Sequence, residues 1–64
     1  MVEFQSRNEM ILWLIDNFFY GYMYKFSEMT NMSDNRLKKE IKKLTKGKMN
    51  MFKENNVYFL EYLF

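Results

Sequence analysis

Hydrophobic residues recur at helical spacing in the first third of the chain. Residues 6–9, Ser-Arg-Asn-Glu, have the form of a capping box, in which the serine and glutamate side chains each accept from a free backbone N–H at a helix start. The apolar residues that follow lie three or four positions apart and are Met10, Ile11, Leu14, Ile15 and Phe18. This pattern predicts a helix that begins at Ser6 and loses its periodicity near Tyr20 and Gly21.

The next stretch predicts a brief strand and then a short helix. Residues 22–25 are aromatic and alternate, which is typical of a strand. A helix is expected over residues 26–31, because Phe26 and Met29 have the spacing of one inward face. Residues 31–34 then form a turn.

A third helix is predicted from about residue 34 to residue 46. Ser33 or Asp34 can cap it, since a short oxygen-bearing side chain accepts from the free amides of the first turn. Gly47 is expected to end it. Its apolar stripe is narrow and consists of Leu37, Ile41 and Leu44.

The C-terminal third predicts a β-hairpin. Residues 49–53 and 57–64 read as two strands, and the tip consists of Glu54, Asn55 and Asn56. Asparagine suits this tip because it tolerates the positive φ of tight hairpin turns. The expected order is helix, short strand, helix, helix and hairpin, in one α+β domain over residues 1–64.

Positive charge is concentrated in the third predicted helix. The chain as a whole has a net charge of +2, but residues 33–48 hold seven basic side chains against Asp34 and Glu40. At 100° per residue, the lysines lie opposite or beside the apolar stripe. Such a face suits duplex DNA, whose charge density compensates the repulsion among the lysines through counterion release. The expected DNA contacts on this helix are Asn35, Arg36, Lys38, Lys39, Lys42, Lys43 and Lys46.

The residue types suggest separate tasks within this face. Asn35 suits bidentate contact with adenine and Arg36 contact with guanine, whereas lysines mostly bind phosphates. At the hairpin tip, Lys53 and Asn55 are further candidates for a minor groove or a phosphate. Two plainer interpretations stay open: the lysines form a solvated face that keeps the chain soluble, and the tip is an ordinary polar turn.

Composition excludes several classes of protein. The chain has no cysteine and no histidine, and it contains no phosphate loop, nucleophile motif or clustered acid pair, so we expect no catalytic residue, metal or cofactor. Charged residues interrupt the first apolar run, so neither a signal peptide nor a membrane span is expected and a cytoplasmic location fits. The abundance of Asn, Lys, Met, Phe and Tyr is typical of an AT-rich virus or mobile element.

The apolar content predicts a homodimer. Aromatic residues make up 20% of only 64 residues, and both faces of the last predicted strand are apolar, which is more than one small core can bury. A two-fold pair would cover the surplus and present two copies of the third helix to successive major grooves. A core role for the tryptophan is an equal alternative to an interface role. The expected interface residues are Trp13, Tyr20, Tyr58 and Tyr62.

From about residue 8 to residue 62 the chain resembles the winged helix-turn-helix superfamily, most closely its small arsenical-repressor and multiple-antibiotic-resistance-repressor regulators. The stretch YKFSEMTNMSDNRLKKEIKKLTKGKMNMF carries the likeness, with a second helix, a turn, a recognition helix and a glycine-led exit into the wing. The resemblance implies three helices with a C-terminal β-hairpin wing. The wing is short, its tip is not arginine-rich, and the family's metal- or ligand-sensing residues have no counterpart here.

Together these features predict a sequence-specific DNA-binding transcriptional regulator that reads the major groove with the helix at about residues 34–46. The alternative is a small viral-type interaction protein that inhibits a host protein such as RNA polymerase or a CRISPR nuclease. Abundant aromatic and methionine residues favour that alternative, because these residue types are enriched in interface cores.

Overall fold

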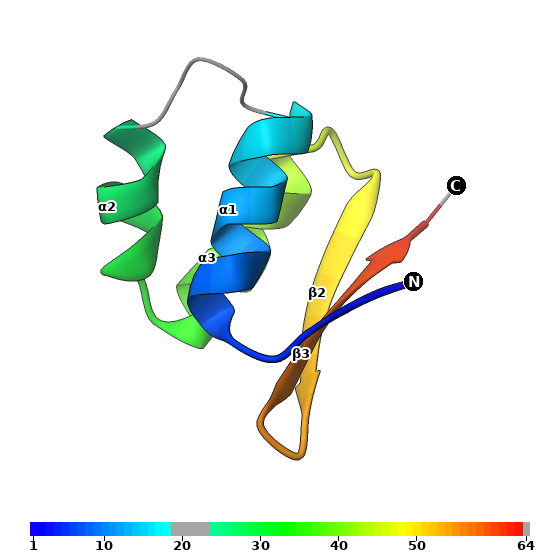
Figure 1. The fold of residues 1–64 in the computed structure, drawn as a ribbon. Helices are drawn as coiled ribbons and strands as arrows, with labels where there is room; N and C mark the ends of the chain where they lie inside the picture. Colours follow the sequence, from blue (N-terminus) through cyan, green and yellow to red (C-terminus); the bar gives the residue numbers. More distant parts are fainter. Residues whose placement is uncertain (19–23, 64) are drawn as a thin grey trace.

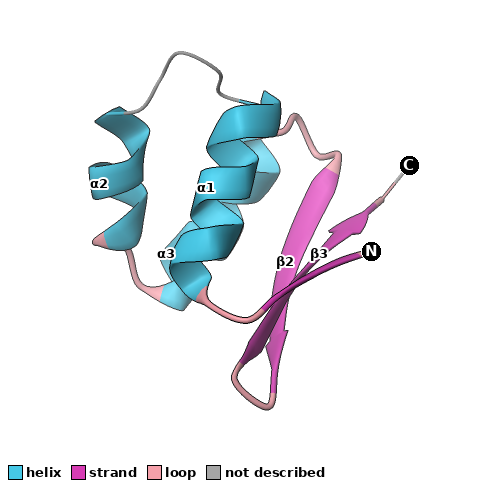
Figure 2. Ribbon diagram, viewed as in Figure 1, coloured by secondary structure: helices cyan, strands magenta, loops and turns pink. Residues whose placement is uncertain are grey.

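A computed structural model describes residues 1–18 and 24–63 (Figure 1), and within them the fold is α+β. Helices α1 and α3 pack on one face of a three-stranded antiparallel sheet and α2 packs against α1 (Figure 2), an arrangement compatible with a winged-helix layout. None of the described helices has the length and apolarity needed to cross a membrane. In chain order the elements are β1 (Val2–Phe4), α1 (Arg7–Phe18), α2 (Tyr24–Thr30), α3 (Asp34–Leu44), β2 (Met49–Glu54) and β3 (Val57–Tyr62).

Helix α1 confirms the start and the inward face that the sequence predicts. The Ser6 hydroxyl oxygen accepts from the backbone N–H of Glu9 at 3.1 Å, as a residue capping the first turn does. Phe18 is partly buried against the core. The fully buried residues of this helix are Met10, Ile11, Leu14 and Ile15.

Helix α2 begins earlier than predicted, and the strand expected at residues 22–25 is wrong where the structure describes it. Tyr24 and Lys25 form the first turn of α2, whereas residues 22 and 23 lie outside the described residues. A four-residue aromatic run is too short to separate strand from helix by periodicity alone, so packing against α1 decides. The predicted inward face is confirmed, because Met29 is fully buried and Phe26 packs against the core.

The N-terminal strand β1 was not predicted. Val2 and Phe4 are paired with Leu60 and Tyr58 of β3, which gives the strand order β1-β3-β2. Three residues are too few to carry an alternating signal, and they form a strand because β3 offers them an open edge. The hairpin is therefore one part of a larger sheet.

The hairpin and its turn confirm the predicted chemistry. Asn55 and Asn56 have φ angles of 50° and 65°, the left-handed backbone that a two-residue hairpin turn requires. Strand β2 continues one residue beyond its predicted end, to Glu54.

Helix α3 ends about two residues earlier than predicted. The last helical residue is Leu44, and Lys46 rather than glycine takes the first left-handed position, with a φ of 56°. The N–H of Gly47 bonds to the Lys42 carbonyl at 2.7 Å and that of Lys46 to the Lys43 carbonyl at 3.1 Å. These two bonds are those of a Schellman motif, in which Gly47 is the second residue beyond the cap.

The core lies between the helices and one face of the sheet. It joins residues of all six elements, and its fully buried side chains belong to α1, α2, α3, β2 and β3. Besides those of α1, they are Met29, Leu37, Ile41, Met49 and Leu60.

Candidate nucleic-acid interface

Helix α3 exposes a basic face because its apolar face packs into the core. The Ser33 hydroxyl accepts from the backbone N–H of Arg36 at 3.2 Å and so caps the helix. Leu37 and Ile41 are fully buried, and this fixes which side of the helix faces water. The candidate residues on α3 and just beyond it are all exposed: Asn35, Arg36, Lys38, Lys39, Lys42, Lys43 and Lys46.

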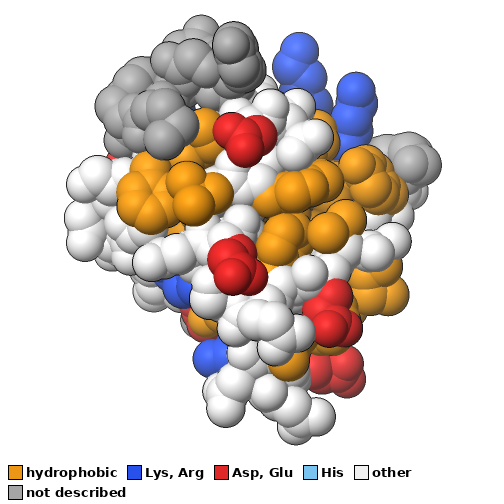
Figure 3. Space-filling view, in the orientation of Figure 1, with side chains coloured by type: hydrophobic (Ala, Val, Ile, Leu, Met, Phe, Trp, Pro, Cys, Tyr) orange, Lys and Arg blue, Asp and Glu red, His pale blue; other side chains and the backbone are white. Residues whose placement is uncertain are grey.

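The α1 side of the molecule differs from the basic face of α3 in the kinds of side chain it exposes. Viewed from the α1 side, hydrophobic and acidic side chains share the surface, and basic side chains come into view mainly at its margin (Figure 3). This segregation agrees with the charge distribution along the sequence, where residues outside 33–48 carry a net negative charge.

Arg7 fastens the turn between α2 and α3, a role that the sequence did not reveal. Its guanidinium donates to the backbone carbonyls of Met29 at 3.4 Å, Thr30 at 3.1 Å and Met32. Its Nε atom also pairs with the Asp34 carboxylate at 2.9 Å. One side chain from the start of α1 therefore satisfies carbonyls at the end of α2 and holds the first residue of α3. The only trace of this role in the sequence is a single arginine directly before the apolar run of α1, and that pattern does not indicate which groups the side chain contacts.

The Asp34 carboxylate also joins α3 to the hairpin. The Tyr58 hydroxyl donates to both of its oxygens, at 3.2 and 3.1 Å. Lys53 lies with its Nζ atom 3.9 Å from the carboxylate and 5.2 Å from the centre of the Tyr58 ring. Asp34 thus joins α3 to α1, β2 and β3. Only Ser33 has the capping role that the sequence allowed for either residue.

These contacts lower the pKa of Asp34. The hydrogen bond from Arg7 is the main cause. The hydrogen bond from Tyr58 and the charges of Arg7 and Lys53 also lower the pKa, whereas partial burial of the carboxyl raises it. A carboxyl whose pKa is lower in the folded state than in the unfolded state stabilises the fold at pH values above the unfolded pKa, which is 3.8 for Asp. That stabilisation disappears as the pH falls through the folded pKa.

We therefore expect Asp34→Asn to be less stable than the wild type at pH 7 and to show a weaker loss of stability on acidification. The measurement is urea unfolding at a series of pH values from neutral to strongly acidic. Tyr58→Phe, which keeps the ring and removes one donor, should give an intermediate pH dependence. An Asp34→Asn variant with the full wild-type pH dependence would contradict the role assigned to this carboxylate.

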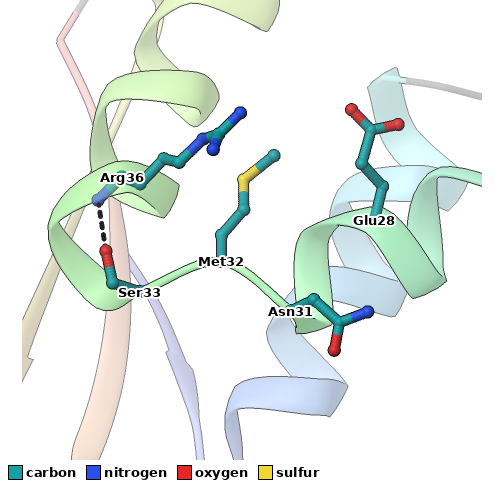
Figure 4. Close-up of a pocket in the computed structure, with 5 residues that line it drawn as sticks. All are labelled: Glu28, Asn31, Met32, Ser33 and Arg36. Atoms are coloured by element: carbon teal, nitrogen blue, oxygen red, sulfur yellow. Dashed lines mark hydrogen bonds between the residues drawn. The ribbon is translucent and has the colours of Figure 1, made fainter.

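A hollow of about 490 Å³ lies between α2 and α3 beside the basic face. Arg36 and Glu28 extend from the two helices on either side of Met32 (Figure 4). The turn supplies Asn31 and Ser33 to its rim. Arg36 thus stands where α3 meets α2, at the margin of the lysine-rich face.

The hairpin contains two of the predicted candidates, Lys53 and Asn55. Lys53 is exposed, but its ammonium group already faces the Asp34 carboxylate and the Tyr58 ring. Asn55 is exposed at the tip. The two candidates in the hairpin are therefore not equivalent, because Lys53 contacts Asp34 and Tyr58 whereas Asn55 lies at the exposed tip.

The predicted interface residues lie in different environments. Trp13 packs against the core, with its ring 5.8 Å from that of Phe4 and 6.2 Å from that of Phe18. Tyr58 is a correction, because its side chain is buried and its hydroxyl binds Asp34, so it has no surface to offer a partner. Tyr62 is 54% exposed, and Tyr20 lies outside the described residues.

Comparison with protein-family models, with curated proteins and with solved structures gives no match to this chain. Within residues 1–18 and 24–63, no three acidic side chains gather into a set that could hold a metal ion. The exposed basic face of α3 is the strongest concentration of one kind of chemistry in the described part of the molecule.

Proposed function

We propose that this protein binds duplex DNA through α3 and acts as a transcriptional regulator. The observation that carries the proposal is the exposed basic face of a helix whose opposite side packs into the core through the fully buried Leu37 and Ile41 and the partly buried Leu44. Six lysines and arginines lie on or directly after this helix, from Arg36 to Lys46. A single-sign surface of this density attracts a polyanion.

A duplex suits this surface better than a small anion. An α-helix fits the major groove, and lysines along one face can reach phosphates on both sides of that groove. Asn35 and Arg36, in the first turn, are the residues with base-reading side chains. The lysines at positions 39, 42, 43 and 46 supply positive charge for phosphate contacts. Such contacts contribute to affinity more than to sequence specificity.

The arrangement around α3 is compatible with a winged helix-turn-helix protein. Helix α2 and a three-residue turn precede α3, and a hairpin follows it. In this proposal Arg7 and Asp34 hold α3 at a constant angle to α2 and to the hairpin, and Asn55 is the residue of the tip that can approach DNA.

A second candidate function is inhibition of a host protein through the apolar surface. Several large hydrophobic side chains are exposed, among them Leu12 at 41% and Tyr62 at 54%. Exposed apolar residues of this size mark interaction surfaces in small proteins. They do not account for the lysines of α3, which is why DNA binding is the leading proposal.

A salt titration separates the two functions. Fluorescence anisotropy of a labelled random-sequence duplex should show binding whose log K falls with log salt concentration with a slope of about −5, as expected for five or six neutralised phosphates. A single-stranded oligonucleotide of the same length is the control and should have a shallower slope. Absence of duplex binding at low salt would favour the protein inhibitor.

A further inference from the structure

One face of the sheet is covered by none of the described helices. Helices α1 and α3 pack on the other face (Figure 1), where Met51, Tyr58 and Leu60 are buried. Successive side chains of a strand point to opposite faces, so the residues that alternate with these lie on the uncovered face, called here the outer face. A bond from the Leu63 N–H to the Lys48 carbonyl extends the pairing beyond the strand ends. The outer face consists of Glu3, Lys48, Asn50, Phe52, Glu54, Val57, Phe59, Glu61 and Leu63.

Two phenylalanines form the centre of the outer face. Phe52 and Phe59 are register partners on β2 and β3, and their rings stack with centroids 5.0 Å apart. Both side chains remain partly exposed, because the helices lie on the other side of the sheet. An aromatic centre with a charged border is the usual anatomy of an interface core and its rim. The pair is therefore an apolar contact point for a partner.

Carboxylates border this pair on three sides. Glu3 is the register partner of Phe59 on β1, so it lies next to the rings across the sheet. Glu61 and Glu54 are the next outer-face residues after Phe59 and Phe52, and they lie in opposite directions because the two strands are antiparallel. At about 3.4 Å per residue, each of them is about 7 Å along the sheet from the phenyl pair.

The charge of the outer face is not balanced. Gln5 donates to Glu3 at 3.2 Å and Asn50 donates to Glu61 at 3.0 Å, but both donors are neutral and leave the carboxylates charged. Three carboxylates against the single ammonium of Lys48 give this face a net charge of −2. Its sign is opposite to that of the exposed side of α3, so the two surfaces attract different partners.

The spacing of these groups matches an extended peptide with cations on either side of an apolar residue. Side chains two positions apart in an extended chain lie about 7 Å apart on one side of it. When the apolar side chain of such a peptide rests on Phe52 and Phe59, the flanking cations reach Glu54 in one direction and Glu61 in the other. Glu3, beside the rings, adds to the attraction for both.

We propose that the outer face docks a cationic segment of a partner protein, in which Lys or Arg stands two positions before and two positions after a large apolar residue. Three strands about 4.8 Å apart and about six residues long project roughly 300 Å², an area suited to a short segment. Contacts of this size are weak, so the isolated segment should bind with a Kd of about 1 mM. The proposal is independent of DNA binding, because α3 packs on the other face of the sheet.

Amide chemical-shift mapping by two-dimensional NMR tests this surface. The probe is the peptide acetyl-Lys-Thr-Trp-Thr-Lys-amide, titrated to about 5 mM, a range suited to the expected Kd. Saturable shifts should concentrate on the three strands and spare α3. Two control peptides carry serine or glutamate in place of both lysines. The serine peptide should bind at least about 3-fold more weakly, and the glutamate peptide should leave the outer-face signals unchanged.

Charge reversal tests the two predicted pairs. Glu54→Lys and Glu61→Lys should each weaken binding of the lysine peptide about 3- to 10-fold, because each turns an attractive pair into a repulsive one. Asp16→Lys makes the same change in net charge at an exposed position of α1, so it is the matched control and should bind like the wild type. Phe59→Ala should also weaken binding. Circular dichroism verifies folding, and Phe52→Ala replaces Phe59→Ala if the latter does not fold.

Four results would overturn the proposal: no saturable shift up to the highest peptide concentration, shifts centred on the helices, a serine peptide that binds as tightly as the lysine peptide, or equal losses in Asp16→Lys and Glu61→Lys. Outer-face signals that move with protein concentration in the absence of peptide would assign the face to a second copy of the chain and would also overturn it. The duplex titration is a separate measurement, since failure of DNA binding leaves this proposal standing and failure of peptide binding leaves the proposed function standing.

Discussion

Replacing Lys39 and Lys42 together with glutamate should reduce duplex affinity at least about 100-fold at physiological salt, while the domain stays folded. Both side chains are exposed on α3, on the side opposite the buried Leu37 and Ile41. In the proposed complex, each substitution would remove a phosphate contact and add repulsion of the same phosphate. Anisotropy with the random-sequence duplex measures the affinity, and thermal unfolding by circular dichroism verifies the fold.

A matched pair of variants distinguishes local charge from net charge. Lys39→Gln with Lys42→Gln removes two positive charges from α3, and Asn8→Glu with Leu12→Glu adds two negative charges to the exposed face of α1. Both proteins then have a net charge of zero, in place of +2. The α3 variant should lose both affinity and about two units of salt slope, and the α1 variant should lose little. Equal losses in the two would mean that α3 is not the binding element.

Ile41→Ala should destabilise the domain by about 2 to 5 kcal/mol, because it removes buried methyl groups and leaves a cavity that the core refills only in part. Ile41 is fully buried at the centre of the inward face of α3. A domain of this length has about 3 to 10 kcal/mol of stability, so much of the variant population should be unfolded at room temperature. Since about 1 kcal/mol shifts the melting temperature of a small domain by 4 to 8 °C, the thermal transition should move by about 8 °C or more.

Ile41→Val serves as the conservative control and should cost about 0.5 to 1.5 kcal/mol. All melts should use one protein concentration, because the homodimer predicted from the sequence would make the melting temperature depend on it. If Ile41→Ala melts within a few degrees of the wild type, α3 is not packed through this residue and its opposite face is not fixed by burial.

The long helices were predictable from the sequence because their signals are local. Helical spacing of apolar residues identified the buried faces of α1 and α3, and the hydroxyls of Ser6 and Ser33 identified their first turns. The turn at Asn55 and Asn56 was predictable for the same reason, since the left-handed backbone is a property of the residue type. The basic face of α3 follows directly, because burial of one side of a helix determines which side is exposed.

Other features depend on residues far apart in the chain, and no local pattern contains them. Arg7 and Asp34 are 27 positions apart, and their ion pair forms because packing of α1 and α2 brings the start of α1 to the turn before α3. Strand β1 forms because β3 has an open edge, and three residues carry no periodicity of their own.

Strand β3 shows most clearly which features the sequence determines and which the tertiary structure decides. Its alternating apolar residues predicted that both faces would be apolar, and this pattern is a property of the sequence alone. Only the tertiary structure decided that Tyr58 and Leu60 face the core while Val57 and Phe59 face outward, since a shift of one residue in register would exchange the two sets. That choice was made by the helices, which bury one face of the sheet and leave the other open.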